Sequence, residues 1–404
     1  MARRDVFTIL LTTFVGMALL YAPQPLFPVL ADQLGVSDTT IASLLTWSLL
    51  PMAVAPLFIG FLMQVMPPRR VLAGSVLLLA GTEFAFAGIN AFGGLLVVRF
   101  LQGALVSTLL TATMTYVSLR ATNVSRVMAL YVAASVLGGL VGRLLAGYGA
   151  PWVGIPTVFA GIGMLAFGSG MLAWGLQPEP QQRRQRIDLS RVGQVLRVPS
   201  LSLLFGVVFS AFFVFTALLN FVPFRVSALV DSGTGTGSLV YAGFVLGIAS
   251  SLLSHRVVSA VGGELRAVAL GSLILGGTLG VAWIESFWAV LLAIVGASVG
   301  FFLLHSVLSG YVNQHTGADT SLVNGLYVAI YYAGGTAGSY VPGLVYEAVG
   351  WSAFLGTLGL VSGLGLILLG RAVQVAPGGA PTGTDPQVES TAPTSQGQCE
   401  PASA

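Results

Sequence analysis

The sequence contains twelve long apolar stretches separated by short polar segments, and this pattern limits the fold more than any other feature. About 20 apolar residues cross the hydrocarbon core of a bilayer, which is about 30 Å thick, and each stretch has about this length or more. Only 8% of the residues are charged, whereas a soluble domain has about 25%. A large soluble enzyme is therefore excluded. The stretches cover residues 6–31, 42–66, 71–90, 94–119, 127–148, 151–176, 201–225, 238–260, 267–284, 287–312, 320–345 and 351–371.

Helices, not strands, are expected across the membrane. The stretches are continuous apolar runs, whereas membrane strands alternate over about ten residues. The 52 glycines suit membrane helices, in which small residues let backbones approach closely. The first stretch follows Arg3 and Arg4 and could be mistaken for a signal peptide. Its apolar run is too long and lacks a convincing cleavage site, so we expect a retained helix.

The arginines predict the orientation. All 17 basic residues are arginine, and arginine-rich loops stay in the cytoplasm. An inner N-terminus puts most arginines inside and leaves only Arg225 at an outer end. Both termini are therefore expected in the cytoplasm, with an even number of spans. The inner arginines would be Arg3, Arg4, Arg69, Arg70, Arg120, Arg126, Arg183, Arg184, Arg186, Arg191, Arg197, Arg256, Arg266 and Arg371.

An internal repeat divides the chain into two halves. Residues 128–147 and 324–343, at an offset of 196, share eight identities in twenty, four of them glycines. A duplicated transporter has such a repeat. The predicted fold is all-α and integral to the membrane, with twelve transmembrane helices in two pseudo-symmetric six-helix bundles. The expected divisions are an N-terminal bundle (1–176), a cytoplasmic linker (177–200), a C-terminal bundle (201–371) and a disordered cytoplasmic tail (372–404).

Several kinds of chemistry lack the residues they require. Without lysine, the chain has no P-loop lysine and no Schiff-base lysine. The single cysteine, Cys399, lies in the polar tail, so a disulfide or thiolate metal site within the chain is excluded. The spans show no convincing Asp–Asp, Ser–His or metal-binding cluster. We therefore expect no enzyme activity, no catalytic residue, no metal and no cofactor, and no binding of nucleic acid.

Three charged residues fall inside the apolar stretches: Glu83, Arg99 and Arg143. Charges there cost at least about 2.5–3.5 kcal/mol at the bilayer centre and are functional candidates. At 1.5 Å per residue, all three lie at similar depth in the outer half, so Glu83 is expected to pair with one arginine. Such a pair could be structural, or it could relay protons or bind substrate. Only Glu83 can titrate, because an arginine stays protonated.

Three short segments resemble motifs of the major facilitator superfamily. Arg99-Phe100-Leu101-Gln102-Gly103 looks like R-x-x-Q-G. The segment from Gly138 to Gly147 resembles the antiporter motif G-x-x-x-G-P-x-x-G-G, with Arg143 in place of the proline. The segment from Gly60 to Arg70 is similar to G-x-L-a-D-r-x-G-r-r-r, with Gln64 in place of the aspartate. The motif or gating residues are Gly60, Arg69, Arg70, Gly103, Gly138, Gly142 and Gly147.

The resemblance is closest to the bacterial branch of sugar-efflux and multidrug proton antiporters. It rests on residues 21–26, 220–225 and 142–143 in addition to the motifs. It implies two bundles around a central cavity and alternating access. It also implies a proton-coupling role for the arginine of the fourth span, Arg99. Glu83, Arg99 and Arg143 are therefore the candidate proton-coupling or ion-pair residues.

Aromatic and amide side chains of the spans are the candidates for substrate contact. Such a lining suits an apolar or amphipathic solute, although tyrosines also anchor spans at the interface. His305 can titrate near neutral pH or only hydrogen-bond between helices. The expected substrate-binding residues are Tyr21, Gln24, Gln102, Phe213, Asn220, His305, Asn324, Tyr327 and Tyr331.

The sequence therefore predicts a proton-coupled efflux transporter for a small apolar or amphipathic, drug-like or sugar-like solute. We expect a monomer in the inner membrane of a bacterium, with the lipid bilayer and the solute as its partners and the proton gradient as its energy source. A uniporter or importer of a small organic solute stays open as an alternative. A membrane receptor or scaffold that does not transport is a third possibility.

Overall fold

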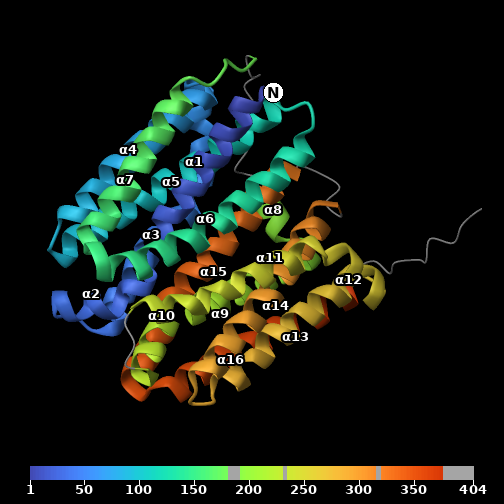
Figure 1. Cartoon of the computed structure of the whole chain (residues 1–404). Helices are drawn as coiled ribbons and strands as arrows, with labels where there is room; N and C mark the ends of the chain where they lie inside the picture. The colour runs from blue at the N-terminus through green and yellow to red at the C-terminus, as the bar shows by residue number, and fades with distance from the viewer. Residues whose placement is uncertain (181–191, 231–233, 315–319, 376–404) are drawn as a thin grey trace, which may run out of the picture.

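A computed structural model describes residues 1–180, 192–230, 234–314 and 320–375, and these residues form helices and short connections without strands (Figure 1). Residues 181–191 of the predicted linker and 376–404 of the predicted tail therefore lie outside the described residues, whereas residues 372–375 of the predicted tail continue α16. The first half contains α1 (Arg3–Tyr21), η1 (Gln24–Leu26), α2 (Phe27–Leu34), α3 (Asp38–Val65), α4 (Pro68–Gly88), α5 (Phe92–Arg120), α6 (Val124–Val153) and α7 (Ile155–Trp174). The second half contains α8 (Val192–Leu196), α9 (Pro199–Leu229), α10 (Thr234–Ser238), η3 (Leu239–Gly243), α11 (Phe244–Leu252), α12 (Ser254–Val261), α13 (Glu264–Ala282), α14 (Phe287–Gln314), α15 (Thr320–Val349) and α16 (Trp351–Val375).

Nine helical segments among the described residues are long and apolar enough to cross a membrane, and the bent segment from Leu239 to Val261 makes a tenth. The helices α3 and α15 have 28 and 30 residues, or about 42 and 45 Å at 1.5 Å per residue. Their length suits a span, although they are not among the ten. The all-helical membrane fold is confirmed, and the count of twelve stays a prediction.

Two of the predicted spans are interrupted. Within the stretch 6–31, α1 ends at Tyr21 because Pro23 and Pro25 cannot extend it. The chain then continues as η1 and α2. The stretch 238–260 bends by 59° between α11 and α12. Both breaks coincide with residues that are not plain apolar ones: Pro23 and Pro25 in the first stretch, and Ser254, His255 and Arg256 at the bend of the second. The length of the stretches alone does not reveal them.

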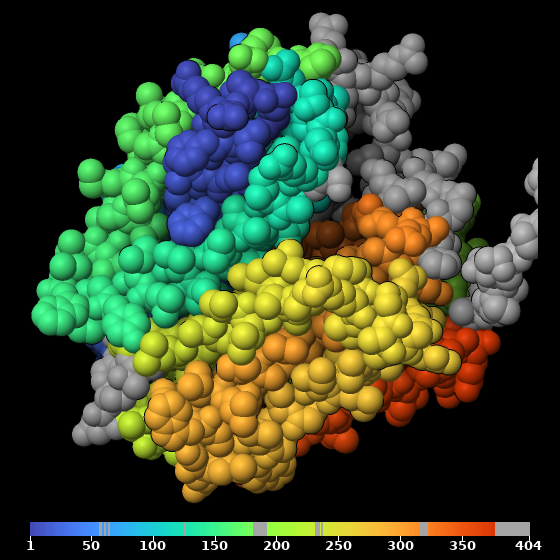
Figure 2. Space-filling view, turned by 45° about the vertical axis from the view of Figure 1, so that its right-hand side comes forward, coloured from blue at the N-terminus to red at the C-terminus, as the bar shows by residue number. Residues whose placement is uncertain are grey.

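The helices pack as two bundles that follow the two halves of the chain. In the first, α1 packs against α6, α3 against α5, and α4 against both α5 and α7. In the second, α9 packs against α15 and α16, and α14 against α11 and α13. The bundles meet where α3 contacts α15 and α6 contacts α10, and Figure 2 shows teal α6 against the yellow-green and yellow helices of the second bundle.

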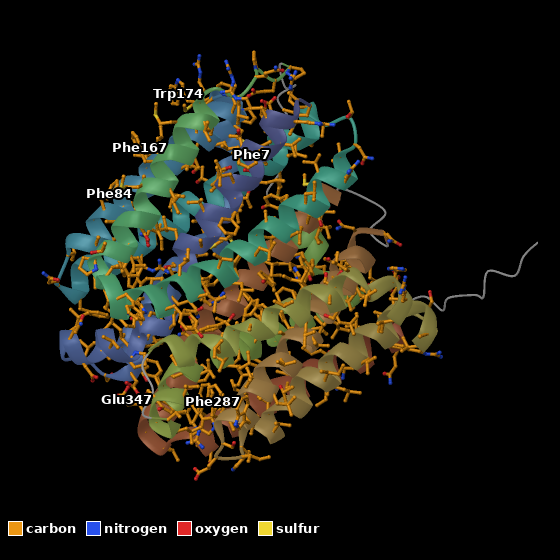
Figure 3. The ribbon with its side chains drawn as sticks, viewed as in Figure 1. Phe7, Phe84, Phe167, Trp174, Phe287 and Glu347 are labelled. Atoms are coloured by element: carbon orange, nitrogen blue, oxygen red, sulfur yellow. The ribbon has the colours of Figure 1, made fainter. Side chains whose placement is uncertain are left out.

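Large apolar side chains cover the outside of the bundles. Figure 3 shows Phe7, Phe84, Phe167 and Trp174 along the outer faces of α1, α4 and α7, and these side chains are 44–62% exposed. In water such a surface would be a liability. In a bilayer it is the expected surface, so the molecule is a multi-pass membrane protein.

Candidate functional site

Glu83 and Arg99 belong to one buried network, but the expected direct ion pair is absent. Gln102 lies between them: its Nε2 donates to Glu83 Oε2 (2.7 Å), and its Oε1 accepts from Arg99 Nη1 (2.7 Å). All three side chains are at most 1% exposed. The ion pairs between described residues, Arg69–Glu179 and Arg225–Glu285, involve neither Glu83 nor Arg99. The prediction of direct pairing was wrong because it considered depth but not the amide one helical turn from Arg99.

The Arg99 guanidinium is held from three sides. Its Nε donates to the carbonyl oxygen of Leu44 (3.3 Å) on α3, and Nη2 donates to that of Leu20 on α1. Together with Gln102, these acceptors fix the planar group between three helices. Glu83 is less well satisfied, because its Oε1 is buried without a hydrogen-bond partner among the described residues. A buried carboxylate oxygen without a partner is costly, so this carboxyl group is suited to a change of protonation.

Arg143 belongs to a second network, which reaches the other bundle. Its Nε donates to Gln24 Oε1 (2.7 Å), and Gln24 Nε2 donates to Asn220 Oδ1 (3.2 Å). Asn220 Nδ2 then donates to the carbonyl oxygens of Ala42 (3.1 Å) and Ser339 (2.9 Å). Sequence reasoning grouped Arg143 with Glu83 and Arg99 by depth. The structure separates them, because Arg143 contacts α1 and η1 and not the carboxyl of α4.

The described hydrogen bonds between the bundles gather at one end of the molecule. We call this the outer end; it holds α2 and α10 and is the predicted extracytoplasmic side (Figure 1). Besides Gln24–Asn220–Ala42, three contacts join α3, or the residue before it, to α15. They are Thr46 Oγ1 to Ser339 Oγ (2.8 Å), Thr39 Oγ1 to the Gly343 carbonyl (2.8 Å) and Ser37 Oγ to Glu347 Oε2 (3.1 Å). The outer end is therefore closed.

Charge is crowded at this closed end. Asp38 begins α3 before the apolar stretch, and burial raises the pKa of its carboxyl, with further increases from the neighbouring charges of Asp32 and Glu347. Arg225 also lines the pocket that contains Asp38 and Glu347. The side chain of Arg225 pairs with Glu285 (3.2 Å). Asp38 is therefore a half-buried carboxyl in an acidic environment and not a fully solvated helix end.

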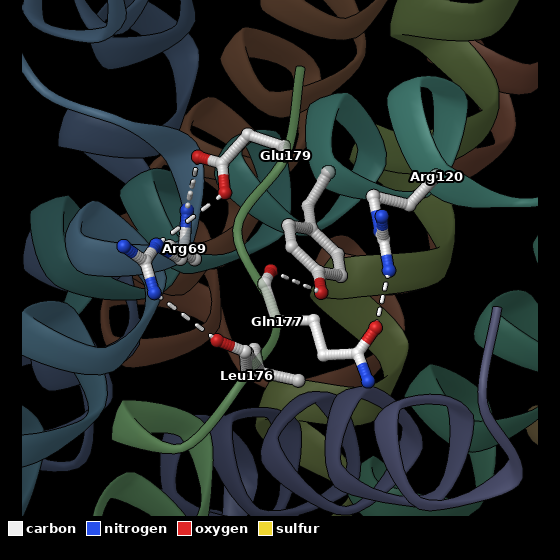
Figure 4. A network of polar contacts seen from close by, with 6 residues as sticks. Arg69, Arg120, Leu176, Gln177 and Glu179 are labelled. Atoms are coloured by element: carbon white, nitrogen blue, oxygen red, sulfur yellow. Dashed lines mark hydrogen bonds and ion pairs between the residues drawn. The ribbon is translucent and has the colours of Figure 1, made fainter.

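Another network lies at the opposite, inner end and stays within the first half of the chain (Figure 4). Arg69 donates from its backbone nitrogen to Glu179 Oε1 (3.2 Å), pairs with that carboxylate through Nε (3.6 Å) and donates from Nη1 to the Leu176 carbonyl (3.3 Å). Gln177 accepts from Tyr116 through its backbone (2.9 Å) and from Arg120 through its side chain (2.6 Å). The residues after α7 thus bind α4 and α5 together.

A cluster of stacked aromatic rings lies inside the second bundle. Phe212 stacks on Tyr331 with centroids 3.8 Å apart, and Phe215 stacks on Phe301 at 4.2 Å. His305 lies 4.8 Å from the Tyr331 ring, and its Nδ1 is 3.0 Å from the Tyr327 hydroxyl. Sequence reasoning missed Phe212, Phe215 and Phe301, because phenylalanines in an apolar run carry no signal that distinguishes packing from a binding surface.

The other predicted residues fall into several environments. Phe213 is 5% exposed and packs beside Phe209, so it belongs to the core. Asn324 makes no hydrogen bond to a described residue, and Arg70 is exposed. Gly103 packs against the Ser48 carbonyl of α3, and Gly138 and Gly142 pack against the α1 backbone. Gly147 lies in α6 and Gly60 in α3.

The comparison with protein families is decisive for the fold and its general role. The family model described as Major Facilitator Superfamily matches residues 9–321. The chain belongs to the Major Facilitator Superfamily. Its relatives include an uncharacterized MFS-type transporter, YybF, of Bacillus subtilis, 25% identical over 91% of this chain and 92% of that one. Another is the inner membrane transport protein YnfM of Escherichia coli, 26% identical over 83% and 82% of the two chains.

Solved structures of superfamily members share the fold. The nucleoside transporter NupG has a TM-score of 0.71 at 13% identity, covering 92% of this chain and 100% of that one. The human organic anion transporter MFSD10 has a TM-score of 0.69 at 19% identity, covering 91% and 99%. The family and its transporter relatives indicate that this superfamily member acts in membrane transport.

Proposed function

We propose that the chain is a proton-coupled efflux transporter that exports a small apolar or amphipathic solute by alternating access. The observation that carries the proposal is the buried Glu83 carboxyl, whose Oε1 has no partner among the described residues. A carboxyl group in this position is neutral when protonated and, when ionised, is balanced by Arg99 through Gln102. Only the ionised state therefore depends on the Arg99 guanidinium for charge compensation.

The coupling step follows from that difference. Arg99 also holds the carbonyl oxygens of Leu20 and Leu44, so a change in charge at Glu83 alters the forces on α1 and α3. Both helices take part in the closed outer end, α3 through Thr46 and α1 through the adjoining Gln24. Protonation of Glu83 thereby biases the choice between the closed and the open outer end, which alternating access requires. Arg99 does not carry the proton, because a guanidinium remains charged.

The test is substrate-induced proton flux in proteoliposomes. The full chain is reconstituted with a trapped pH-sensitive dye, a pH gradient is imposed, and drugs, sugars and amino-acid-like solutes are added in turn. The expected result is flux with at least one solute, abolished in Glu83→Gln and unchanged in the matched control Glu285→Gln, whose side chain is 80% exposed. Solute uptake that persists after the gradient is collapsed, with Glu83→Gln equal to the parent, would establish a uniporter instead.

A further inference from the structure

Arg143 is a buried positive charge with no acidic partner in the part of the chain that the structure describes. The side chain is 2% exposed, and its two described hydrogen bonds, from Nε to Gln24 Oε1 and from Nη1 to the Gly139 carbonyl (3.0 Å), go to neutral acceptors and leave Nη2 unused. Neither ion pair between described residues includes it. Burial of an unpaired charge is strongly unfavourable, so a structural role alone does not account for an arginine here.

Three aromatic rings surround this guanidinium. Its carbon lies 4.3 Å from the ring centroid of Tyr21, 4.9 Å from that of Tyr241 and 5.0 Å from that of Phe244. Tyr21 belongs to the first bundle, whereas Tyr241 and Phe244 belong to the second. Cation–π contacts recover part of the lost solvation. They also leave the charge uncompensated and place it at the seam between the bundles, where a transported solute must pass.

Tyr21, beside Arg143, is one of three neighbouring tyrosines whose hydroxyls have no hydrogen-bond partner among the described residues. Its hydroxyl is close enough to those of Tyr331 and Tyr332 to interact with them electrostatically, and none of the three donates to a described residue. Other tyrosines of the spans do: Tyr116 donates to the Gln177 carbonyl and Tyr241 to that of Leu219 (3.1 Å). Tyr21, Tyr331 and Tyr332 are each partly exposed, so their hydroxyls are free to donate to a bound solute.

The chemistry of this group favours one class of ligand. A guanidinium edge and tyrosine hydroxyls donate hydrogen bonds to a carboxylate, and none of the described residues that contact Arg143 is acidic. The Tyr331 ring is stacked on Phe212 at an interplanar angle of 9° and forms a T-shaped pair with Tyr332 at 4.9 Å. An aromatic cluster of this kind favours a solute with a planar ring. An acidic side chain would be needed to favour a cation, and none lies among these residues.

We propose that the transported solute is an organic anion with a planar aromatic body. Its carboxylate binds at Arg143 and Tyr21, and its ring lies near Tyr331 and Tyr332. This inference rests on the proposed transport function and narrows its substrate class. Arg143 is then a specificity-determining residue and not a member of the proton-coupling group.

The test is binding by the full chain in detergent without a proton gradient, measured by calorimetry. The probes are 2-naphthoate, its neutral amide 2-naphthamide and the cation 2-naphthylmethylammonium, which share the ring and differ in charge. Naphthoate is expected to bind at least about tenfold more tightly than either of the others, the range typical of a charge-assisted contact. Equal binding of the three probes, a preference for the cation, or no binding of naphthoate would overturn the proposal.

Variants locate the site and separate it from proton coupling. Arg143→Lys and Tyr21→Phe are expected to weaken naphthoate binding and to leave naphthamide binding unchanged. Tyr21→Phe keeps the ring beside Arg143, so it decides the matter if Arg143→Lys does not fold. Unaltered naphthoate affinity in folded variants would overturn the assignment. Glu285→Gln, at an exposed position, is the control and is expected to bind naphthoate like the parent. Binding is measured without a proton gradient, so loss of proton flux in Glu83→Gln and loss of naphthoate affinity in Arg143→Lys are separate results.

Discussion

The two halves of this transporter share the same glycine packing between helices and differ in the side chains around it. In the first half, Gly138 and Gly142 of α6 pack against the backbone of α1, at the carbonyls of Phe14 and Ala18. In the second, Gly334 and Gly338 of α15 pack in the same way against α9, at the carbonyls of Phe209 and Phe213.

The side chains around these equivalent contacts are of opposite kinds. The first half carries the buried charges Glu83, Arg99 and Arg143, whereas the second carries stacked rings such as Phe212 and Phe301 and has Ser339 opposite Arg143 in the repeat. The glycine packing preserves the shared fold while the surrounding positions diverge. We infer that the first half supplies the buried charged groups and that the second half supplies apolar aromatic surface.

The largest expected effect is a loss of stability when the glycine packing shared by the two halves is disrupted. A Cβ at position 142 or 338 would collide with the backbone carbonyl of Ala18 or Phe213, and backbone cannot move aside as a side chain can. Gly142→Ala and Gly338→Ala are each expected to lower the stability by about 2 kcal/mol or more, as overpacking does. Thermal unfolding in detergent measures this.

The matched control for both variants is Gly363→Ala on α16, where a Cβ meets no atom within 4 Å. It is expected to change the stability by less than about 1 kcal/mol, in the stabilising direction given by helix propensity. If Gly338→Ala were as stable as the parent while Gly142→Ala was not, the glycine packing of the two halves would not be equivalent.

The next effect concerns the charged half alone. Arg99→Lys keeps the charge but loses the planar fork that reaches Gln102, Leu20 and Leu44 together. Solute-driven proton flux is expected to fall at least about tenfold, since a single ammonium cannot replace a group fixed in three directions. The exposed Arg126→Lys is the control and should transport normally. Normal flux in Arg99→Lys would show that only the charge at Arg99 matters.

A smaller effect is expected where the halves meet. Gln24 and Asn220 share one hydrogen bond (3.2 Å), so a double-mutant cycle with alanine at both positions should give a coupling energy of about 0.5–1.5 kcal/mol. The single variants also break other bonds, since Asn220 donates to the carbonyls of Ala42 and Ser339 and Gln24 accepts from Arg143. The cycle removes these contributions and isolates the shared bond. A coupling energy near zero would mean that the closed outer end does not depend on the amide pair.

The smallest effect should be a pH dependence at the outer end. The pKa of Asp38 is raised by burial and by nearby Asp32 and Glu347, so its stabilising contribution is complete below the unfolded-state pKa and is lost as the pH rises through the raised value. Asp38→Asn should therefore reduce the loss of thermal stability between about pH 4 and pH 8, by less than about 1 kcal/mol for a half-buried group. Glu285→Gln should leave the profile unchanged, and a steeper profile in Asp38→Asn would reverse the sign of our argument.

The sequence predicted the helical membrane fold, the family and the burial of its charges, because these depend on composition and on short motifs. Two kinds of detail could not be predicted from the sequence. The partners of Arg99 include the carbonyls of Leu20 and Leu44, and backbone acceptors carry no residue signature. The separation of Arg143 from Glu83 depends on which way each helix faces, and depth along a helix says nothing of its rotation.

The internal repeat also relates the positions of Gln24 and Asn220, the two amides that meet between the halves. The two residues are 196 positions apart, the same offset that relates α6 to α15, while the glycine contacts with α1 and α9 are offset by 195. The amides therefore occupy nearly the same place in the two halves and meet across the pseudo-two-fold axis. At a contact between matched positions of two related halves, each residue faces the counterpart of itself. An amide suits that position because it carries both a donor and an acceptor, as a self-complementary contact requires. A carboxylate would meet a second negative charge, and an arginine a second positive one.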